Sequence, residues 1–242
     1  MKRLILKPLL CLITVNFLAP SAHAFQIKPG EFDVQLGGFN STQGVNQHIN
    51  IDDLIGNQYT VSNKNKKNGL VGLAFLMKGQ PLDHFTPLFG LNTFYLPKTT
   101  VNGEIIQEDL FSNFHYQYHV THCPVYIETK LLVQPPVRPN LNVTIDVGLG
   151  PNFMSTTGYT ERALNDYSQP DKSFYDHTSV NFSATAGLGM RLSHALGQAP
   201  LECGYRFYYL GQGRLTPRVT QILNHLKTGE IYTNAILCSL IV

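Results

Sequence analysis

Residues 141–153 read LNVTIDVGLGPNF, and apolar side chains occupy every second position from Leu141 to Leu149. Asn, Thr, Asp and Gly fill the positions between them. A period of two places successive side chains on opposite faces, which is the pattern of a β-strand with one apolar and one polar face. A tilted strand needs about 9 to 11 residues to cross a bilayer. We therefore predict a membrane-spanning strand over 141–154.

A second stretch repeats this alternation. Residues 179–192 read SVNFSATAGLGMRL, with apolar side chains from Val180 to Leu192 on one parity and Ser, Asn, Thr, Gly and Arg on the other. No window after residue 24 approaches 18 consecutive apolar residues. Because a helix needs about 20 such residues to cross a membrane, the sequence predicts spanning strands and not spanning helices.

Six further segments are spaced to match these two, which predicts an all-β chain. The eight expected strands cover residues 32–40, 69–77, 88–98, 111–133, 141–154, 178–192, 201–214 and 229–242. The short connectors, rich in Pro or Gly, are 78–87, 134–140 and 193–200, and the long polar ones are 41–68 and 155–177. This layout predicts an eight-stranded antiparallel up-and-down transmembrane β-barrel with short periplasmic turns and longer extracellular loops.

Two segments bear on the strand register. Asn-Gly at 102–103 is expected to form the tight tip of the second outer loop, because this pair is a strong hairpin signal. In 111–133 the residues from Phe114 to Val120 are apolar on one parity, whereas those from Val125 to Val133 are apolar on the other. This predicts a β-bulge near 121–124, where Pro124 cannot donate to a ladder, or two separate strands. The segment is more than twice as long as a barrel strand requires, so its first half is expected to project beyond the membrane.

The N-terminus has the features of a secretory signal peptide. Three basic residues in the first seven positions precede an uncharged apolar run over 9–19, and Ala-His-Ala at 22–24 supplies a cleavage pattern. We expect residues 1–24 to be removed and the barrel domain, 25–242, to begin at Phe25. The 18 basic residues then become 15 against 16 acidic ones. This near-neutral balance does not favour nucleic-acid binding.

Three cysteines remain after the leader, Cys123, Cys203 and Cys238. An odd number without a CxxC pattern does not predict a disulfide framework, although one pair could form in an oxidising compartment. The other interpretation is that they are small, half-buried apolar side chains.

From residue 25 onward the chain resembles the small outer-membrane β-barrels of the OmpA/OmpW-like superfamily of Gram-negative bacteria. The leader, the eight strands, Val-Gly-Leu-Gly-Pro-Asn-Phe at 147–153 and a strand that runs to the last residue carry the likeness. The resemblance implies a place in the cell outer membrane, contact with outer-membrane lipid and insertion by the outer-membrane assembly machinery. Family members usually end in an aromatic residue, where this chain has Val242. They act variously as tethers, adhesins and small-solute pores, so the resemblance implies a place more firmly than a task.

Charged residues on the polar parity lie toward the same end of their strands. They are Asp33, Glu128, Lys130, Asp146, Arg191, Glu202 and Arg206. An eight-stranded barrel has an interior about wide enough for side chains to fill it. Because an unpaired buried charge is costly, we expect these residues to form a lumen charge network that plugs the barrel.

Few residues suggest chemistry. His115, His119 and Cys123 share a parity, but residues four apart on a strand lie about 13 Å apart, too far for one metal ion. We expect polar side chains there that face inward between outward aromatic ones. Ser193 and His194 are adjacent, so on a strand they would point to opposite faces. We therefore expect no metal site, no catalytic residue and no cofactor.

These observations favour a non-enzymatic integral outer-membrane barrel with a structural or surface-interaction role. Its extracellular loops would be available to a host or surface ligand. Three alternatives stay open: a narrow pore or small-molecule conduit, an outer-membrane lipid-modifying enzyme, and a soluble lipocalin-like carrier. In the carrier the apolar parity would face inward and the charged residues outward.

Overall fold

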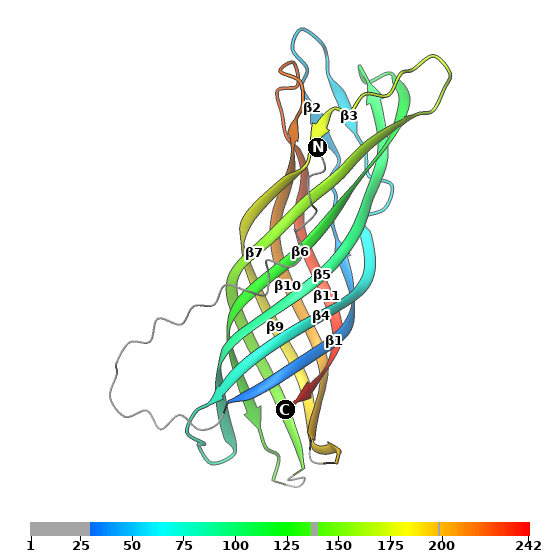
Figure 1. Cartoon of the computed structure of the whole chain (residues 1–242). Coiled ribbons are helices and arrows are strands. Elements are labelled where there is room, and N and C mark those ends of the chain that lie inside the picture. Colours follow the sequence, from blue (N-terminus) through cyan, green and yellow to red (C-terminus); the bar gives the residue numbers. More distant parts are fainter. Residues whose placement is uncertain (1–29, 137–139, 198) are drawn as a thin grey trace, which may run out of the picture.

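The computed structural model describes residues 30–136, 140–197 and 199–242. Within them, eight long antiparallel strands form a closed ring, which confirms the predicted barrel (Figure 1). These strands are β1 (Glu31–Thr42), β4 (Asn65–Lys78), β5 (Phe85–Gln107), β6 (Phe111–Val133), β7 (Leu141–Ala163), β9 (His177–Leu196), β10 (Ala199–Pro217) and β11 (Leu226–Ile241). The predicted signal peptide and the predicted first residue of the mature chain, Phe25, lie outside the described residues. In the described ranges no helix is long and apolar enough to cross a bilayer.

The first and last strands close the ring. Asp33 on β1 pairs with Ile241 on β11, and the pairing continues without a shift to Thr42 and Tyr232. The C-terminus lies at the lower end in Figure 1, together with the short connection at 79–84 between β4 and β5. The upper end carries β2 (Gln47–Ile49), β3 (Asn57–Tyr59) and β8 (Phe174–Tyr175) in its longer connections.

Strand β6 shows how the two faces of the wall change along the barrel. In its lower half Glu128 and Lys130 point inward and are buried, whereas Ile127 points outward with 75% of its surface exposed. In its upper half Tyr116 and Tyr118 are buried inside the barrel. The outward positions there are polar, from His115 to Thr121. The lower half is therefore apolar outside and polar inside, and the upper half is the reverse.

This inversion corrects the expected irregularity at 121–124. Even-numbered residues of β6 face inward from Phe114 to Lys130 without a slip, and Thr121 to Pro124 pair in register with β7. The change of apolar parity marks the change of environment and not a bulge or a second strand. An irregularity does lie near the expected height, but on the neighbouring strand: the β5–β6 pairing shifts between Leu96 and Thr99, which pair with His122 and Val120 of β6. Two further shifts lie higher, between Ile105 and Ile106 on β5 and between Gln117 and His119 on β6.

The expected tip at Asn102-Gly103 is also wrong. Both residues lie inside β5, and Gly103 pairs with Tyr116 on β6. A Cβ at residue 103 would lie 1.6 Å from the carbonyl oxygen of Thr60, so glycine is needed where the segment between β3 and β4 runs alongside β5 and hydrogen-bonds to Asn102 and Glu104. The tip falls instead at 108–110, where Glu108 and Asp109 have positive φ.

Candidate functional site

All seven residues of the expected lumen charge network lie inside the lower half of the barrel. Asp33, Glu128, Lys130, Asp146, Arg191, Glu202 and Arg206 are each at most 5% exposed. The structure brings them into two groups of ion pairs. A lipocalin-like arrangement would put these charges outside, so that alternative is wrong.

The first group is centred on Lys130 and Arg191. The Lys130 Nζ lies 3.3 Å from the Asp33 carboxylate and 3.0 Å from that of Glu202. Arg191 contacts the other oxygen of Glu202 at 2.9 Å and the carboxylate of Glu31 at 2.8 Å. Each cation is shared by two carboxylates, so the group links β1, β6, β9 and β10 across the interior.

The second group is centred on Arg206. Its guanidinium lies 2.7 Å from the Glu128 carboxylate and 2.6 Å from that of Asp146. The Asn92 amide donates to Glu128 at 2.7 Å, and the Arg206 guanidinium lies over the Phe94 ring at 5.2 Å from its centroid. This group sits where the polar interior meets the aromatic one.

Glycines in the wall make room for these long side chains. A Cβ on Gly187 would lie 2.5 Å from the Asp146 carboxylate, and one on Gly189 would lie 2.7 Å from the Thr144 hydroxyl. On the other side of the lumen, a Cβ on Gly72 would lie 2.5 Å from the ring of Phe94. Small and large residues therefore alternate across the lumen, which lets the charges fit inside a narrow ring.

Sequence reasoning missed two polar members and the whole aromatic filling. Glu31 and Asn92 face inward beside the charged residues. Glu31 lies one residue before the predicted strand 32–40, and Asn92 lies on the polar parity of the predicted strand 88–98 but carries no charge. The upper interior is closed by buried rings and aliphatic side chains, among them Tyr59, Phe94, Tyr116, Tyr118, Tyr126, Tyr159, Phe174 and Tyr208. The sequence does contain one indication of this aromatic filling. The tyrosines of β6 occupy even-numbered positions, as Glu128 and Lys130 do, so they point to the same inner face.

A small polar hollow of about 110 Å³ opens at the upper mouth. Glu161 lines it from β7, and its carboxylate accepts hydrogen bonds from Ser173 Oγ at 2.6 Å and Tyr159 Oη at 2.5 Å. Asp171 and Tyr59 lie on its wall. Burial raises the pKa of the Glu161 carboxyl above its ordinary value. The hydrogen bonds that this carboxylate accepts favour its ionised form and oppose the shift, but the loss of solvation on burial is the larger effect and the charge of Asp171 adds to it.

The histidine and cysteine positions of β6 face outward, which corrects the expected inward placement. His115, His119 and Cys123 are half-buried on the outer surface, and the aromatic residues between them are the inward ones. In the described ranges no three His, Cys, Asp or Glu residues come close enough to hold a metal ion. Ser193 and His194 lie near the C-terminal end of β9, which continues to Leu196, and not in the connector expected at 193–200.

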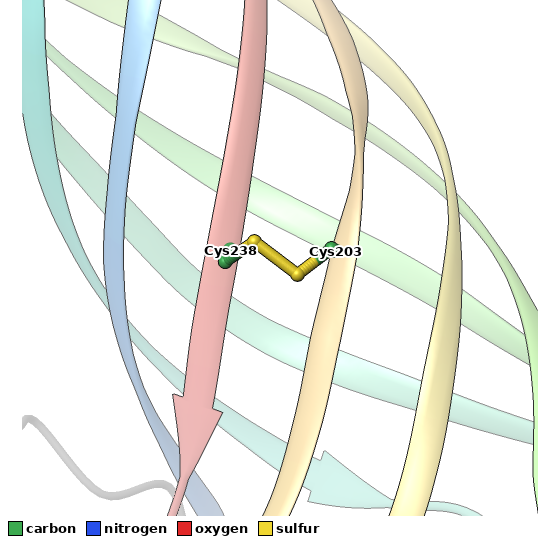
Figure 2. The surroundings of a disulfide bond; sticks show 2 residues. All are labelled: Cys203 and Cys238. Carbon is green, nitrogen blue, oxygen red and sulfur yellow. A yellow bond between two sulfur atoms is a disulfide. The ribbon is translucent and has the colours of Figure 1, made fainter. Parts of the chain in front are cut away.

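Cys203 and Cys238 form a disulfide between neighbouring strands, which answers the question that the cysteine count left open (Figure 2). The two residues pair directly across β10 and β11, with their Cα atoms 4.1 Å apart. Both side chains lie on the outer face, among apolar residues such as Ile236 and Leu240.

No protein-family model matches the chain, and no curated protein is similar to it in sequence. Among solved structures it is similar to the outer membrane protein OprG from Pseudomonas aeruginosa, with 13% identity over 89% of this chain and 97% of that one and a TM-score of 0.47. It is also similar to the outer membrane protease OmpT from Escherichia coli, with 10% identity over 91% and 99% of the two chains and a TM-score of 0.48. A third is Ail from Yersinia pestis in complex with a heparin analogue, with 10% identity over 89% and 100% and a TM-score of 0.38.

The fold assignment rests on this chain's own strand order, since such distant similarities add little to it. The ring is closed by β1 with β11 and by β5 with β6, its charges point inward, and its lower outer face is apolar. The chain therefore has the fold of the small outer-membrane β-barrels.

Proposed function

We propose that this chain is an integral outer-membrane protein held in the bilayer by the lower half of its barrel. Outward residues there are apolar and widely exposed, for example Val147 at 54%, Leu188 at 58% and Ile236 at 71%. A continuous exposed apolar surface of this kind needs lipid around it, because soluble proteins rarely expose large apolar patches. The upper half, with its polar outer face, then extends beyond the bilayer toward the loops.

We further propose a non-enzymatic, structural or surface-interaction role with a closed lumen. The observation that carries this proposal is that the interior is filled at both levels. Arg206 and its carboxylates occupy the lower half, and Phe94, Tyr126 and Tyr208 pack directly above them. The Phe94 ring centroid lies 5.2 Å from that of Tyr208 and 6.3 Å from that of Tyr126. Such packing supports a plug and disfavours a water-filled path.

Fractionation tests the membrane location. The protein should require detergent for extraction and should migrate differently on a gel before and after heating, as closed barrels do. Release into the soluble fraction without detergent would contradict the location.

Planar-bilayer recording on refolded protein tests the closed lumen. We expect no conductance above that of bilayers treated with detergent alone. A steady conductance whose ion selectivity changes in Arg206→Gln would overturn the plug and establish the pore alternative. Incubation with outer-membrane lipids followed by mass spectrometry tests the enzyme alternative, and a new acylated or deacylated lipid species would overturn the non-enzymatic role.

A further inference from the structure

The polar hollow at the upper mouth carries two carboxylates and, among the described residues, no basic side chain. Its polar wall also holds three amides and a hydroxyl, and the set is Glu161, Asp171, Asn57, Gln107, Gln169 and Ser173. Neither Glu161 nor Asp171 belongs to an ion pair within the described ranges. Burial raises the pKa of the Glu161 carboxyl, and the negative charge of Asp171 adds to that shift. Both carboxylates are therefore open to a cation from outside the chain.

The size of the hollow limits which cation it admits. Its volume is about 110 Å³, whereas a pocket that encloses a drug-sized ligand has about 300 to 1,000 Å³. The hollow has roughly the space of three or four water molecules, which is also enough for the ammonium of a lysine or the guanidinium of an arginine. The N–H groups of these cations are donors that match the carboxylates of Glu161 and Asp171. The hollow therefore admits one charged group, and the rest of its ligand must lie outside.

Exposed apolar side chains flank the hollow on the connections at the upper end in Figure 1. Tyr167 is 97% exposed and comes two residues before Gln169 of the hollow wall. Leu110 is 73% exposed, and the exposed Phe111 pairs with Gln107 of the same wall. We call the exposed apolar residues of these connections the apolar rim, which consists of Leu54, Ile55, Leu110, Phe111, Leu164 and Tyr167.

Hydrogen bonds hold the segments that carry the apolar rim in one arrangement. The backbone N–H of Ile55 donates to the Glu108 carboxylate at 3.1 Å, which joins the β2–β3 hairpin to the turn after β5. The side-chain amide of Asn113 donates to Gln107 at 2.7 Å, and its carbonyl oxygen accepts from the N–H of Leu164 at 2.8 Å. A surface that is already ordered loses less entropy when it binds. Because an exposed apolar cluster outside lipid marks an interaction site, the apolar rim is a surface for a partner.

We propose that the upper mouth binds a polypeptide that inserts one lysine or arginine side chain into the hollow and packs apolar side chains on the apolar rim. This inference rests on the surface-interaction role proposed above and states the chemistry of its partner. A polypeptide fits better than a free amine, because the hollow and the apolar rim lie side by side and a free amine fills only the first.

The charges on the same connections favour a basic partner. Asp52 and Asp53 directly precede Leu54 of the apolar rim, and Glu108 and Asp109 directly precede Leu110. These carboxylates attract a basic polypeptide and repel an anionic membrane surface, because complementary potentials steer a partner to its site.

The test uses the refolded barrel in detergent micelles and three fluorescent nonapeptides. The first peptide has a central lysine flanked by leucines. In the second, uncharged norleucine replaces the lysine, and in the third, serines replace the leucines. Binding is measured by fluorescence anisotropy, with n-butylammonium and calcium chloride as competing probes.

Two variants are each compared with a matched control. The hollow variant carries Glu161→Gln and Asp171→Asn, and its control carries Asp176→Asn and Glu230→Gln, which removes two carboxylates outside the hollow. The rim variant carries Leu110→Ser and Tyr167→Ser. Its control carries Val219→Ser and Leu223→Ser, which are exposed on the connection between β10 and β11.

We expect the lysine peptide to bind the wild type and both controls alike and to bind the hollow variant about tenfold more weakly, as loss of a hydrogen bond to a charged group predicts. The norleucine peptide should bind more weakly than the lysine peptide and should not distinguish the wild type from the hollow variant. The rim variant should weaken the lysine peptide but not the serine peptide. The small probe n-butylammonium should compete only at much higher concentration, because it does not contact the apolar rim.

Three results would overturn the proposal. They are equal binding of the lysine and norleucine peptides to the wild type, equal losses in the variants and their controls, and competition by calcium at lower concentration than n-butylammonium, which would assign the hollow to a metal ion. Heat-modifiable mobility shows that each variant folds, and the comparison of peptides on the wild type tests the proposal even where a variant does not. Ion conductance or a modified lipid would contradict the closed, non-enzymatic role, whereas lack of peptide selectivity alone contradicts only this partner.

Discussion

Asp146 and Gly187 face each other across β7 and β9, and the carboxylate of Asp146 occupies the space that a side chain at 187 would need. A Cβ there would lie 2.5 and 2.6 Å from the two carboxylate oxygens. Arg206 holds the same carboxylate at 2.6 Å, so it cannot turn away without losing an ion pair. The absence of a side chain at 187 is thus part of the charge network.

Gly187→Ala should therefore lower the free energy of unfolding by about 1 to 3 kcal/mol, the usual cost of overpacking a dense interior. The control is Gly38→Ala on the outer face of β1, where the nearest atom to an added Cβ is 3.9 Å away. Urea unfolding of both variants in lipid vesicles, followed by gel mobility, gives the comparison. Equal stability of the two variants would mean that the interior yields more easily than its packing indicates.

The apolar outer surface predicts a position-dependent cost for a charge. Val147→Arg should cost about 2 to 4 kcal/mol if residue 147 lies near the bilayer midplane. Gln117→Arg, on the polar outer face of β6, should cost little. An inward position such as Thr144 is not a suitable control. Its hydroxyl lies 2.7 Å from where a Cβ on Gly189 would be, so the barrel interior has no room there for an arginine side chain. Folding yields and unfolding midpoints in vesicles measure the effect, and similar costs at 147 and 117 would argue against a membrane boundary between them.

Arg206→Ala should cost about 3 to 5 kcal/mol, because it leaves the carboxylates of Glu128 and Asp146 buried without their cation. Replacing all three by Met, Gln and Asn should recover most of that loss, since the charges then disappear together. The measurement is the free energy of unfolding of the triple variant, which should be higher than that of Arg206→Ala. No recovery in the triple variant would show that Arg206 acts by filling space beside Phe94 rather than by pairing charges.

Much of the fold follows from local rules that a single strand obeys. The period of two in 141–153 identifies β7, and the same parity assigns Asp146 to the interior. The upper half could not be assigned in that way, because the rule "apolar faces out" holds only where lipid is the solvent. Above the lipid, Tyr116 and Tyr118 turn inward for the same reason that Ile127 turns outward below, since each apolar side chain avoids water. The sequence contains both the apolar-outward and the apolar-inward pattern, but it does not show at which level of the barrel one replaces the other.

The ion-pair partners and the disulfide depend on geometry that crosses the ring. Arg191 on β9 and Glu31 on β1 are far apart in the sequence, so their contact at 2.8 Å needs the closed barrel. Cys203 and Cys238 become partners only because β10 and β11 pair in a register that sets them opposite each other. The Asn-Gly pair at 102–103 misled for a related reason. The hairpin signal depends on neighbouring residues alone, whereas the structure at Gly103 depends on the distant segment 60–62, which pairs alongside β5.

The disulfide should stabilise the barrel without being required for its formation. It joins residues 35 positions apart, and the chain-entropy model assigns about 3 to 4 kcal/mol to a loop of that length. Most of the wall closes through strand pairs that do not involve it. Cys203→Ala with Cys238→Ala should fold to a heat-modifiable barrel with a lower urea midpoint. A reductant should likewise lower the urea midpoint of the wild type, and a wild-type midpoint that does not change on reduction would show that the disulfide does not stabilise the barrel.

Glu161 should make the upper mouth more stable in acid than at neutral pH. Burial raises the pKa of its carboxyl in the folded protein, so between its unfolded and folded pKa values the folded state binds more protons than the unfolded one. Local stability is then fully present below the unfolded pKa and falls as the pH rises through the folded one.

Glu161→Gln keeps an oxygen that can accept from Ser173 and Tyr159 but carries no charge, so it should remove this dependence. Asp166→Asn, on the connection that follows β7 but outside the hollow, is the control and should leave the dependence in place. Amide hydrogen exchange at residues 159–161 and 171–174 between about pH 4 and pH 7, corrected for intrinsic rates, measures the protection. Protection that rises with pH in the wild type would mean that the folded protein stabilises the ionised carboxylate. An equal fall in Glu161→Gln would assign the pH dependence to another group.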